Sequence, residues 1–96
     1  MKYKPRPGIV YTKICGVNML IPTRSVYDVC DRIEILPWLK DAAWRSLCSG
    51  NTVENLIKGH RILTKCSEEE ATAYYMDFCD DLCKKGFLLP DDEAST

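Results

Sequence analysis

Apolar and polar residues alternate along the front third of the chain, which is the pattern of β-strands. Residues 9–14 are rich in β-branched and aromatic side chains and residues 17–21 alternate strictly, so both segments are predicted to be strands. The second segment places Val17, Met19 and Ile21 on one face, and Asn18 and Leu20 on the other. Cys15 and Gly16 supply a turn between the segments and Pro22 ends the second one, so the pair is expected to form a hairpin.

A third strand is predicted over residues 32–36, after a polar connection. Ile33 and Ile35 face one way in this segment, and Arg32 and Glu34 face the other. Together with the hairpin, this strand is expected to complete a three-stranded antiparallel sheet.

Apolar residues recur every three to four positions in the rest of the chain, which predicts three helices. The first helix is expected to begin at Pro37, whose missing amide is no loss in a first turn, and to end at Gly50. Its apolar stripe consists of Leu39, Ala43, Trp44 and Leu47. The second helix is expected to be capped at residues 51–52 and to end near residues 59–60, and residues 62–66 to cross to the last helix.

The last helix has start and stop signals at both ends. Ser67 and Glu70 form a capping box, so both can satisfy free amides of the first turn. The apolar stripe consists of Ala71, Tyr75, Phe78 and Leu82. The two lysines at 84–85 suit the helix dipole, and Gly86 supplies a left-handed stop after which Phe87 folds back onto the helix end.

Strands followed by helices predict an α+β domain. A three-stranded antiparallel sheet followed by a three-helix bundle is winged-helix-like, here with the sheet at the front. Residues 8–89 are expected to form this single domain, residues 1–7 a flexible or extended N-terminal arm, and residues 90–96 a loose acidic tail.

The charge and hydropathy of the chain narrow the classes of partner. The net charge of −1 lacks the basic excess of a dedicated DNA-binding domain, so nucleic acid is not the expected partner. No apolar run approaches the roughly 20 residues of a membrane span, and the basic N-terminus is not followed by the apolar core of a signal peptide. A cytoplasmic protein without a membrane partner is therefore expected.

Six cysteines are many for 96 residues, and in a secreted protein they would suggest disulfides. In a cytoplasmic protein they are expected to stay reduced, and four of them fall at or beside predicted core positions: Cys30, Cys48, Cys66 and Cys79. Cys79 and Cys83 share a helix face and would begin a metal site, but no second Cys/His pair stands at a recognised spacing.

The sequence contains little that is typical of an enzyme. It has no glycine-rich phosphate loop, and its one histidine, His60, is expected to be solvated in a short loop. A binding module without catalytic residues or a cofactor is therefore the prediction. A three-stranded sheet has two edges, and an extended peptide can pair with such an edge as an added strand.

The order and spacing of several motifs resemble the PqqD family, named for a small protein of pyrroloquinoline quinone (PQQ) biosynthesis. The resemblance spans about residues 8–89. The motifs that carry it lie at residues 19–23, 33–36, 50–57, 67–71 and 78–88, together with Trp44 and Leu47. The chain departs from the family pattern at Pro37, Ala43 and Cys79.

This resemblance implies a peptide chaperone. Such domains bind the leader of a ribosomally synthesised and post-translationally modified peptide (RiPP) precursor, and present it to a modifying enzyme, often a radical S-adenosylmethionine (SAM) enzyme. The leader is expected to lie between the third strand and the last helix. The residues expected to contact it are Arg32, Ile33, Glu34 and Ile35 on the strand and Tyr74, Asp77, Asp81 and Lys84 on the helix.

Three other interpretations remain open at this point. The predicted helices also fit a winged-helix DNA-binding regulator, although its second helix would have only Lys58 and Arg61 near its end. Cys79 and Cys83 also fit a thiol redox or metal protein. An unpaired sheet edge or the N-terminal arm would support a homodimer.

Overall fold

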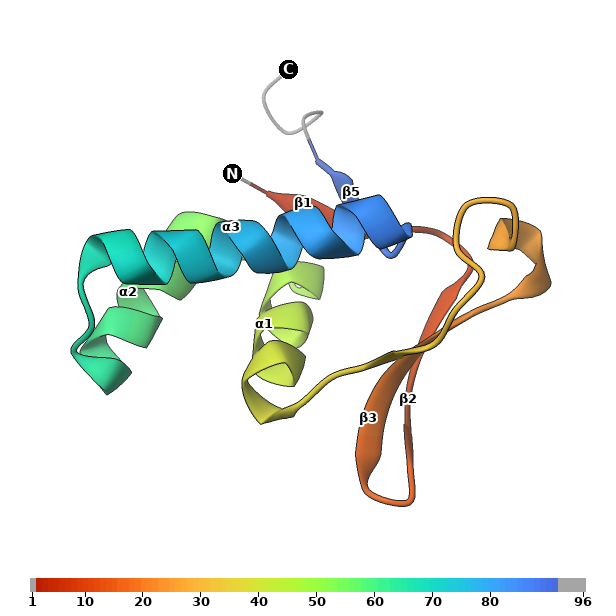
Figure 1. Cartoon of the computed structure of the whole chain (residues 1–96), viewed down its shortest axis with the longest axis horizontal. Coiled ribbons are helices and arrows are strands. Elements are labelled where there is room, and N and C mark those ends of the chain that lie inside the picture. The colour runs from red at the N-terminus through yellow and green to blue at the C-terminus, as the bar shows by residue number, and fades with distance from the viewer. Residues whose placement is uncertain (1, 92–96) are drawn as a thin grey trace.

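The computed structural model, which describes residues 2–91, is an α+β fold in which the predicted hairpin forms one side of the molecule (Figure 1). Strands β2 (Ile9–Ile14) and β3 (Val17–Pro22) pair antiparallel along their full length. Their turn has positive φ at both central residues, 52° at Cys15 and 79° at Gly16, as a tight two-residue hairpin turn requires. The predicted third strand is shorter than expected: β4 covers only Glu34–Ile35 and pairs with β3.

The sheet has the strand order β2-β3-β4. Its more apolar face points away from the helices. Leu20 and Leu36 are buried on the inner face, whereas Val17 and Ile35 on the outer face are 38% and 59% exposed. The alternation predicted from the sequence is therefore confirmed, and the core takes the face that carries the leucines. Tyr11 also points inward and donates a hydrogen bond to the buried carboxylate of Asp41.

Three helices follow the sheet, as predicted: α1 (Trp38–Cys48), α2 (Val53–Thr64) and α3 (Glu68–Lys85). A short 3₁₀ helix, η1 (Arg24–Val26), lies between β3 and β4. Figure 1 shows α3 as the longest helix, lying across α1 and α2. The apolar stripes of α1 and α3 form the core with the inner face of the sheet, and their buried members are Ala43, Trp44, Leu47, Ala71, Tyr75, Phe78 and Leu82.

Helix α2 is longer than the sequence predicted. It continues through Gly59 and His60 to Thr64, and ends where Lys65 adopts a left-handed φ of 56°. Glycine inside a helix costs only about 1 kcal/mol relative to alanine, so the stop expected at Gly59 is overridden by the packing of α2 on α3. The expectation of a solvated loop histidine is therefore wrong, because His60 is a half-buried residue of α2.

Helix α3 begins and ends as predicted. Ser67 Oγ accepts a hydrogen bond from the Glu70 amide at 3.1 Å, and Gly86 ends the helix with a φ of 94°. Phe87 then folds back into the core, where it is fully buried. A Cβ atom at Gly86 would lie 2.4 Å from the carbonyl oxygen of Val29, so the loop before β4 closes directly over this glycine.

The N-terminal segment is not a free arm. Residues of β1 (Tyr3–Pro5) pair with those of β5 (Leu88–Pro90) in a two-stranded antiparallel sheet. The Arg6 guanidinium adds a 2.8 Å hydrogen bond from Nε to the carbonyl of Gly86. The segment is therefore extended and joined to the C-terminal end of the fold. Of the predicted acidic tail, Pro90 belongs to β5, and residues 92–96 lie outside the described residues.

The cysteines are free thiols in different environments. Cys30 and Cys79 are buried, Cys66 is half-buried, and Cys48, beside the buried Leu47, is exposed. Among residues 2–91, no helix is both long and apolar enough to cross a membrane.

Candidate functional site

The outer edge of β4 presents free backbone groups. The Leu36 amide donates to the carbonyl of Asn18 in β3, and backbone groups in a strand alternate in direction. The amide and carbonyl of Ile35 therefore point away from β3. Within residues 2–91 no strand pairs with this edge, so the outward amide and carbonyl of Ile35 are available to an extended peptide.

A hollow on α3 lies close to this edge. It measures about 270 Å³ and is lined by Lys40, Tyr74, Asp77, Phe78 and Asp81. Lys40 belongs to the first turn of α1, which follows β4 after two residues in the sequence. The structure thus brings together three of the four residues that the sequence predicted on the helix side: Tyr74, Asp77 and Asp81.

Lys85 joins the strand to the helix beside the hollow. Its Nζ atom lies 3.1 Å from Glu34 Oε1 and 3.0 Å from Asp81 Oδ2. The side chain of Glu34 is only 15% exposed. The carboxylates of Asp81 and Glu34 raise the pKa of Lys85 above its ordinary value. Glu34 is therefore mostly buried and paired with Lys85, and its predicted contact with a peptide stays a prediction.

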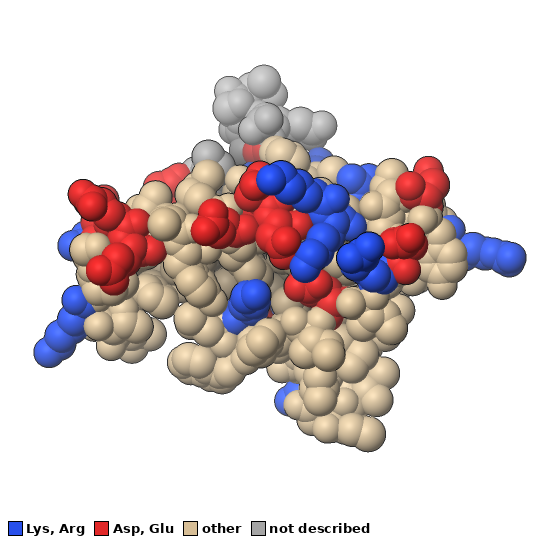
Figure 2. Space-filling model, viewed as in Figure 1, with Lys and Arg blue, Asp and Glu red and all other residues tan. Residues whose placement is uncertain are grey.

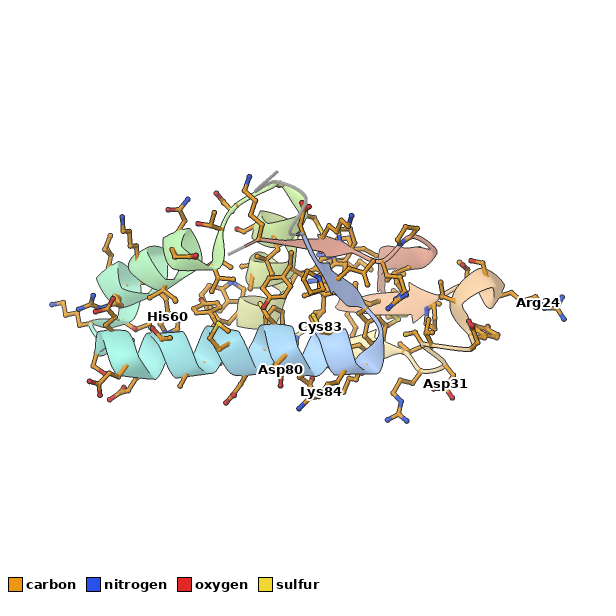
Figure 3. All side chains as sticks on the ribbon, turned by 90° about the horizontal axis from the view of Figure 1, so that it is seen from above. Arg24, Asp31, His60, Asp80, Cys83 and Lys84 are labelled. Atoms are coloured by element: carbon orange, nitrogen blue, oxygen red, sulfur yellow. The ribbon has the colours of Figure 1, made fainter. Side chains whose placement is uncertain are left out.

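Arg32 and Lys84 lie outside the hollow. The Arg32 side chain is 69% exposed and its Nε lies 3.7 Å from Asp31 Oδ1. Lys84 forms a 3.0 Å ion pair with Asp80, and Figure 3 shows both side chains on the side of α3 that points away from the rest of the fold. The ion pair and the hydrogen bond to Asp80 raise the pKa of Lys84. The structure therefore does not bring these two predicted residues together with the other three on α3.

Tyr74 is held in place by an aromatic cluster that the sequence did not indicate. The ring of His60 stacks on Tyr74 with centroids 5.6 Å apart, and its Nδ1 lies 3.1 Å from the hydroxyl of Tyr75. Figure 3 shows His60 between α2 and α3. Burial raises the pKa of both tyrosines, so they are neutral donors at neutral pH. The sequence would have indicated this cluster only if α2 had been predicted to continue past Gly59, which places His60 on the helix.

Another hollow with an apolar lining lies between α1 and α2. It measures about 360 Å³, and Trp38 and Leu63 flank it, 80% and 79% exposed. Its lining includes Leu56, His60 and Tyr75, so the aromatic cluster forms one wall of this hollow as well.

The two thiols considered for metal binding do not form a reactive pair. Burial raises the pKa of Cys79 to about 12, and burial also raises that of Cys83. Both groups are therefore protonated thiols at neutral pH, which are poor nucleophiles. Over residues 2–91, no three His, Cys, Asp or Glu side chains are grouped closely enough to hold a metal ion.

Charged side chains are distributed unevenly over the surface. Figure 2 shows acidic and basic side chains gathered over the C-terminal half of α3, whereas the surface over the β2–β3 hairpin is almost wholly uncharged. Asp77 has no ion-pair partner in the part of the chain that the structure describes. The hollow therefore contains a carboxylate that is not engaged in an ion pair.

Comparison of the chain with protein-family models, with curated proteins and with solved structures finds no match.

Proposed function

We propose that this protein is a PqqD-like peptide chaperone that binds an extended leader peptide as an added strand on β4. In this proposal the fold acts as a winged-helix-like recognition domain in the cytoplasm, without catalytic residues or a cofactor of its own. Its partners are a ribosomally made precursor peptide and a radical SAM enzyme that modifies it. The observation that carries the proposal is the outward-facing backbone of Ile35 beside the hollow on α3.

The peptide gains affinity from two parts of this site. Its main chain pairs with the free edge of β4, where each hydrogen bond contributes about 1 kcal/mol. Its side chains on the helix side enter the hollow, where Tyr74 and Phe78 offer apolar contact and Asp77 offers a carboxylate. The backbone supplies affinity that any extended peptide can use, and the hollow supplies selection among peptides.

Two steps test the proposal. Affinity capture with tagged protein from nuclease-treated lysate of the source organism, read by mass spectrometry down to small peptides, is expected to recover a short precursor peptide and its radical SAM enzyme. A synthetic copy of that peptide is then titrated against two variants of one residue. Ile35→Pro removes the outward amide and is expected to weaken binding at least tenfold, about 1.4 kcal/mol, whereas Ile35→Thr keeps the amide and is expected to weaken it far less.

Equal affinity of both variants would show that the peptide does not pair with β4. Circular dichroism of Ile35→Pro is the control for folding, since Glu34 and Leu36, which face β3, keep their amides. Failure to recover any precursor peptide from cells that express one would remove the chaperone proposal itself.

One observation favours a second function. Three basic side chains, Lys58, Arg61 and Lys65, line a single hollow at the end of α2. A cluster of basic side chains such as this one can contact DNA phosphates. The sequence indicated Lys58 and Arg61, and the structure places Lys65 beside them. A gel shift at low salt with random-sequence duplex DNA tests it, and the expected result is no retardation.

A further inference from the structure

The hollow on α3 combines an unpaired carboxylate with two aromatic rings. Asp77 has no ion-pair partner within residues 2–91, and Asp81, one turn further along the same side of α3, repels it. The rings of Tyr74 and Phe78 line the same hollow, and Phe78 is only 6% exposed. A ligand that enters the hollow therefore meets both apolar surface and an acidic group.

The charges in and beside this hollow do not cancel. Asp81 shares the ammonium group of Lys85 with Glu34, at 3.0 and 3.1 Å, so one cation serves two carboxylates. Lys40 lines the hollow from α1, but its ammonium group forms no ion pair in the described part of the chain. Three carboxylates and two lysines therefore surround this site, which leaves one negative charge for a ligand to neutralise.

We propose that the peptide bound on β4 inserts a basic side chain, lysine or arginine, into this hollow. This inference rests on the proposed function for the presence of an extended peptide, and adds the kind of side chain that the site selects. A lysine or arginine packs its aliphatic stem on apolar surface while its charge stays at the rim. The rings of Tyr74 and Phe78 offer that surface and attract a cation, and the Asp77 carboxylate accepts its hydrogen bonds.

Other classes of side chain fit the hollow less well. An apolar side chain contacts the two rings but displaces water from Asp77 without replacing its hydrogen bonds, which costs free energy. An acidic side chain meets both Asp77 and Asp81, and Lys40 alone among the lining residues attracts it. The hollow therefore selects a basic side chain both by attraction and by the cost that it imposes on the other classes.

The first test uses a small probe and no peptide. N-acetyl-arginine methylamide is titrated into the free protein from about 1 to 100 mM at constant ionic strength and followed by amide NMR shifts, since a single side chain binds weakly. Shifts are expected at Tyr74 and Asp77, and the uncharged N-acetyl-norleucine methylamide is expected to cause much smaller ones. Glu69, in the acidic first turn of α3, is the internal reference. Equal shifts at Glu69 and Asp77 would show general attraction to acidic groups and would overturn the proposal.

Three variants show whether the probe binds in the hollow. Asp77→Asn is expected to raise the dissociation constant of the arginine probe at least about threefold. Lys40→Met is expected to lower it about twofold, because a competing cation is removed. The matched control is Asp80→Asn, whose carboxylate pairs with Lys84 outside the hollow, and no change is expected. Unchanged affinity of Asp77→Asn, or an equal loss in Asp80→Asn, would overturn the proposal.

The second test uses the captured leader peptide, with each residue replaced in turn by arginine, glutamine and glutamate. At one position the wild-type protein is expected to favour arginine over glutamine at least about fivefold, and Asp77→Asn is expected to lose most of that preference. A peptide that protects the Ile35 amide but has no such position would overturn this inference and leave strand addition standing. Binding of the arginine probe in the hollow, without any peptide pairing on β4, would overturn the proposed function and leave the preference of the hollow standing.

Discussion

Lys85 and Glu34, 51 residues apart in the sequence, form an ion pair with 3.1 Å between Nζ and Oε1 that ties the last helix to the edge strand. The Glu34 side chain is 15% exposed and that of Lys85 is 31% exposed, so water screens this pair less than the pairs on the outer side of α3. The pair holds β4 at a fixed position relative to the hollow, and thereby positions both halves of the proposed peptide site.

The first prediction concerns this pair. Lys85→Met keeps the aliphatic stem and leaves the Glu34 carboxylate without its cation, so we expect a loss of about 1–2 kcal/mol in the free energy of unfolding. Lys84→Met is the matched control, because its 76% exposed side chain pairs with an exposed Asp80, and little change is expected. Urea denaturation at pH 7 measures both variants. Equal stability of Lys85→Met and the wild type would show that the pair does not join helix and strand.

The same pair predicts a dependence on pH. The pKa of Lys85 is raised in the folded protein, so its stabilising contribution is fully present below the unfolded value of 10.5 and is lost as pH rises through the higher folded pKa. The stability difference between the wild type and Lys85→Met is therefore expected to be constant from pH 7 to about pH 9 and to shrink above about pH 10.5. Parallel urea titrations measure it, and a difference that grew with pH would contradict the assignment.

Gly86 and Gly50 provide a matched pair of glycine substitutions. Both have a left-handed φ, 94° and 92°, but a Cβ at Gly86 would lie 2.4 Å from the Val29 carbonyl oxygen, whereas at Gly50 it would meet nothing within 4 Å. Gly50→Ala is expected to cost about 1 kcal/mol for its backbone conformation alone, and Gly86→Ala at least about 2 kcal/mol more because the loop before β4 must move. Denaturant unfolding compares the two. Equal losses in the free energy of unfolding would show that the loop before β4 moves without a cost in stability.

The buried thiol of Cys79 is expected to be inert. Its pKa of about 12 leaves almost no thiolate at pH 8, and its side chain is fully buried. Reaction with a thiol reagent at pH 8 is therefore expected to modify the exposed Cys15 within seconds to minutes and Cys79 only as fast as the protein unfolds. Mass spectrometry of digested samples assigns each site, and rapid labelling of Cys79 would reopen the redox and metal interpretations.

Local signals explain which parts of the fold were predictable. The ends of α3 depend on Ser67, Glu70 and Gly86, each of which acts within a few residues, and all three behave as the sequence indicated. The end of α2 depends on tertiary packing that outweighs the helix penalty of Gly59. The pairing of β1 with β5 joins two three-residue strands from opposite ends of the chain, and neither carries a local signal for its partner.

The same distinction applies to the candidate site. Tyr74, Asp77 and Asp81 were predictable because they lie off the apolar stripe of one helix, and a helix fixes which residues share a face. Lys40 and Lys85 were missed because their places depend on how α1 and β4 approach α3. The sequence also did not predict which face of the β2-β3-β4 sheet is buried. Alternation identifies two faces, and only packing decides which of them is buried.

NMR measurement of amide hydrogen exchange tests strand addition most directly. The exchange rates of the protein's amides are compared between the free protein and its complex with the captured leader peptide. Binding is expected to slow exchange of the Ile35 amide, and of the Ile33 amide beside it, by at least about 100-fold, because both become hydrogen-bonded to the peptide. The Leu36 amide, already bonded to Asn18, is expected to change much less and serves as the internal reference. Tight binding with unchanged exchange at Ile33 and Ile35, or with new protection confined to the hollow between α1 and α2, would contradict the account.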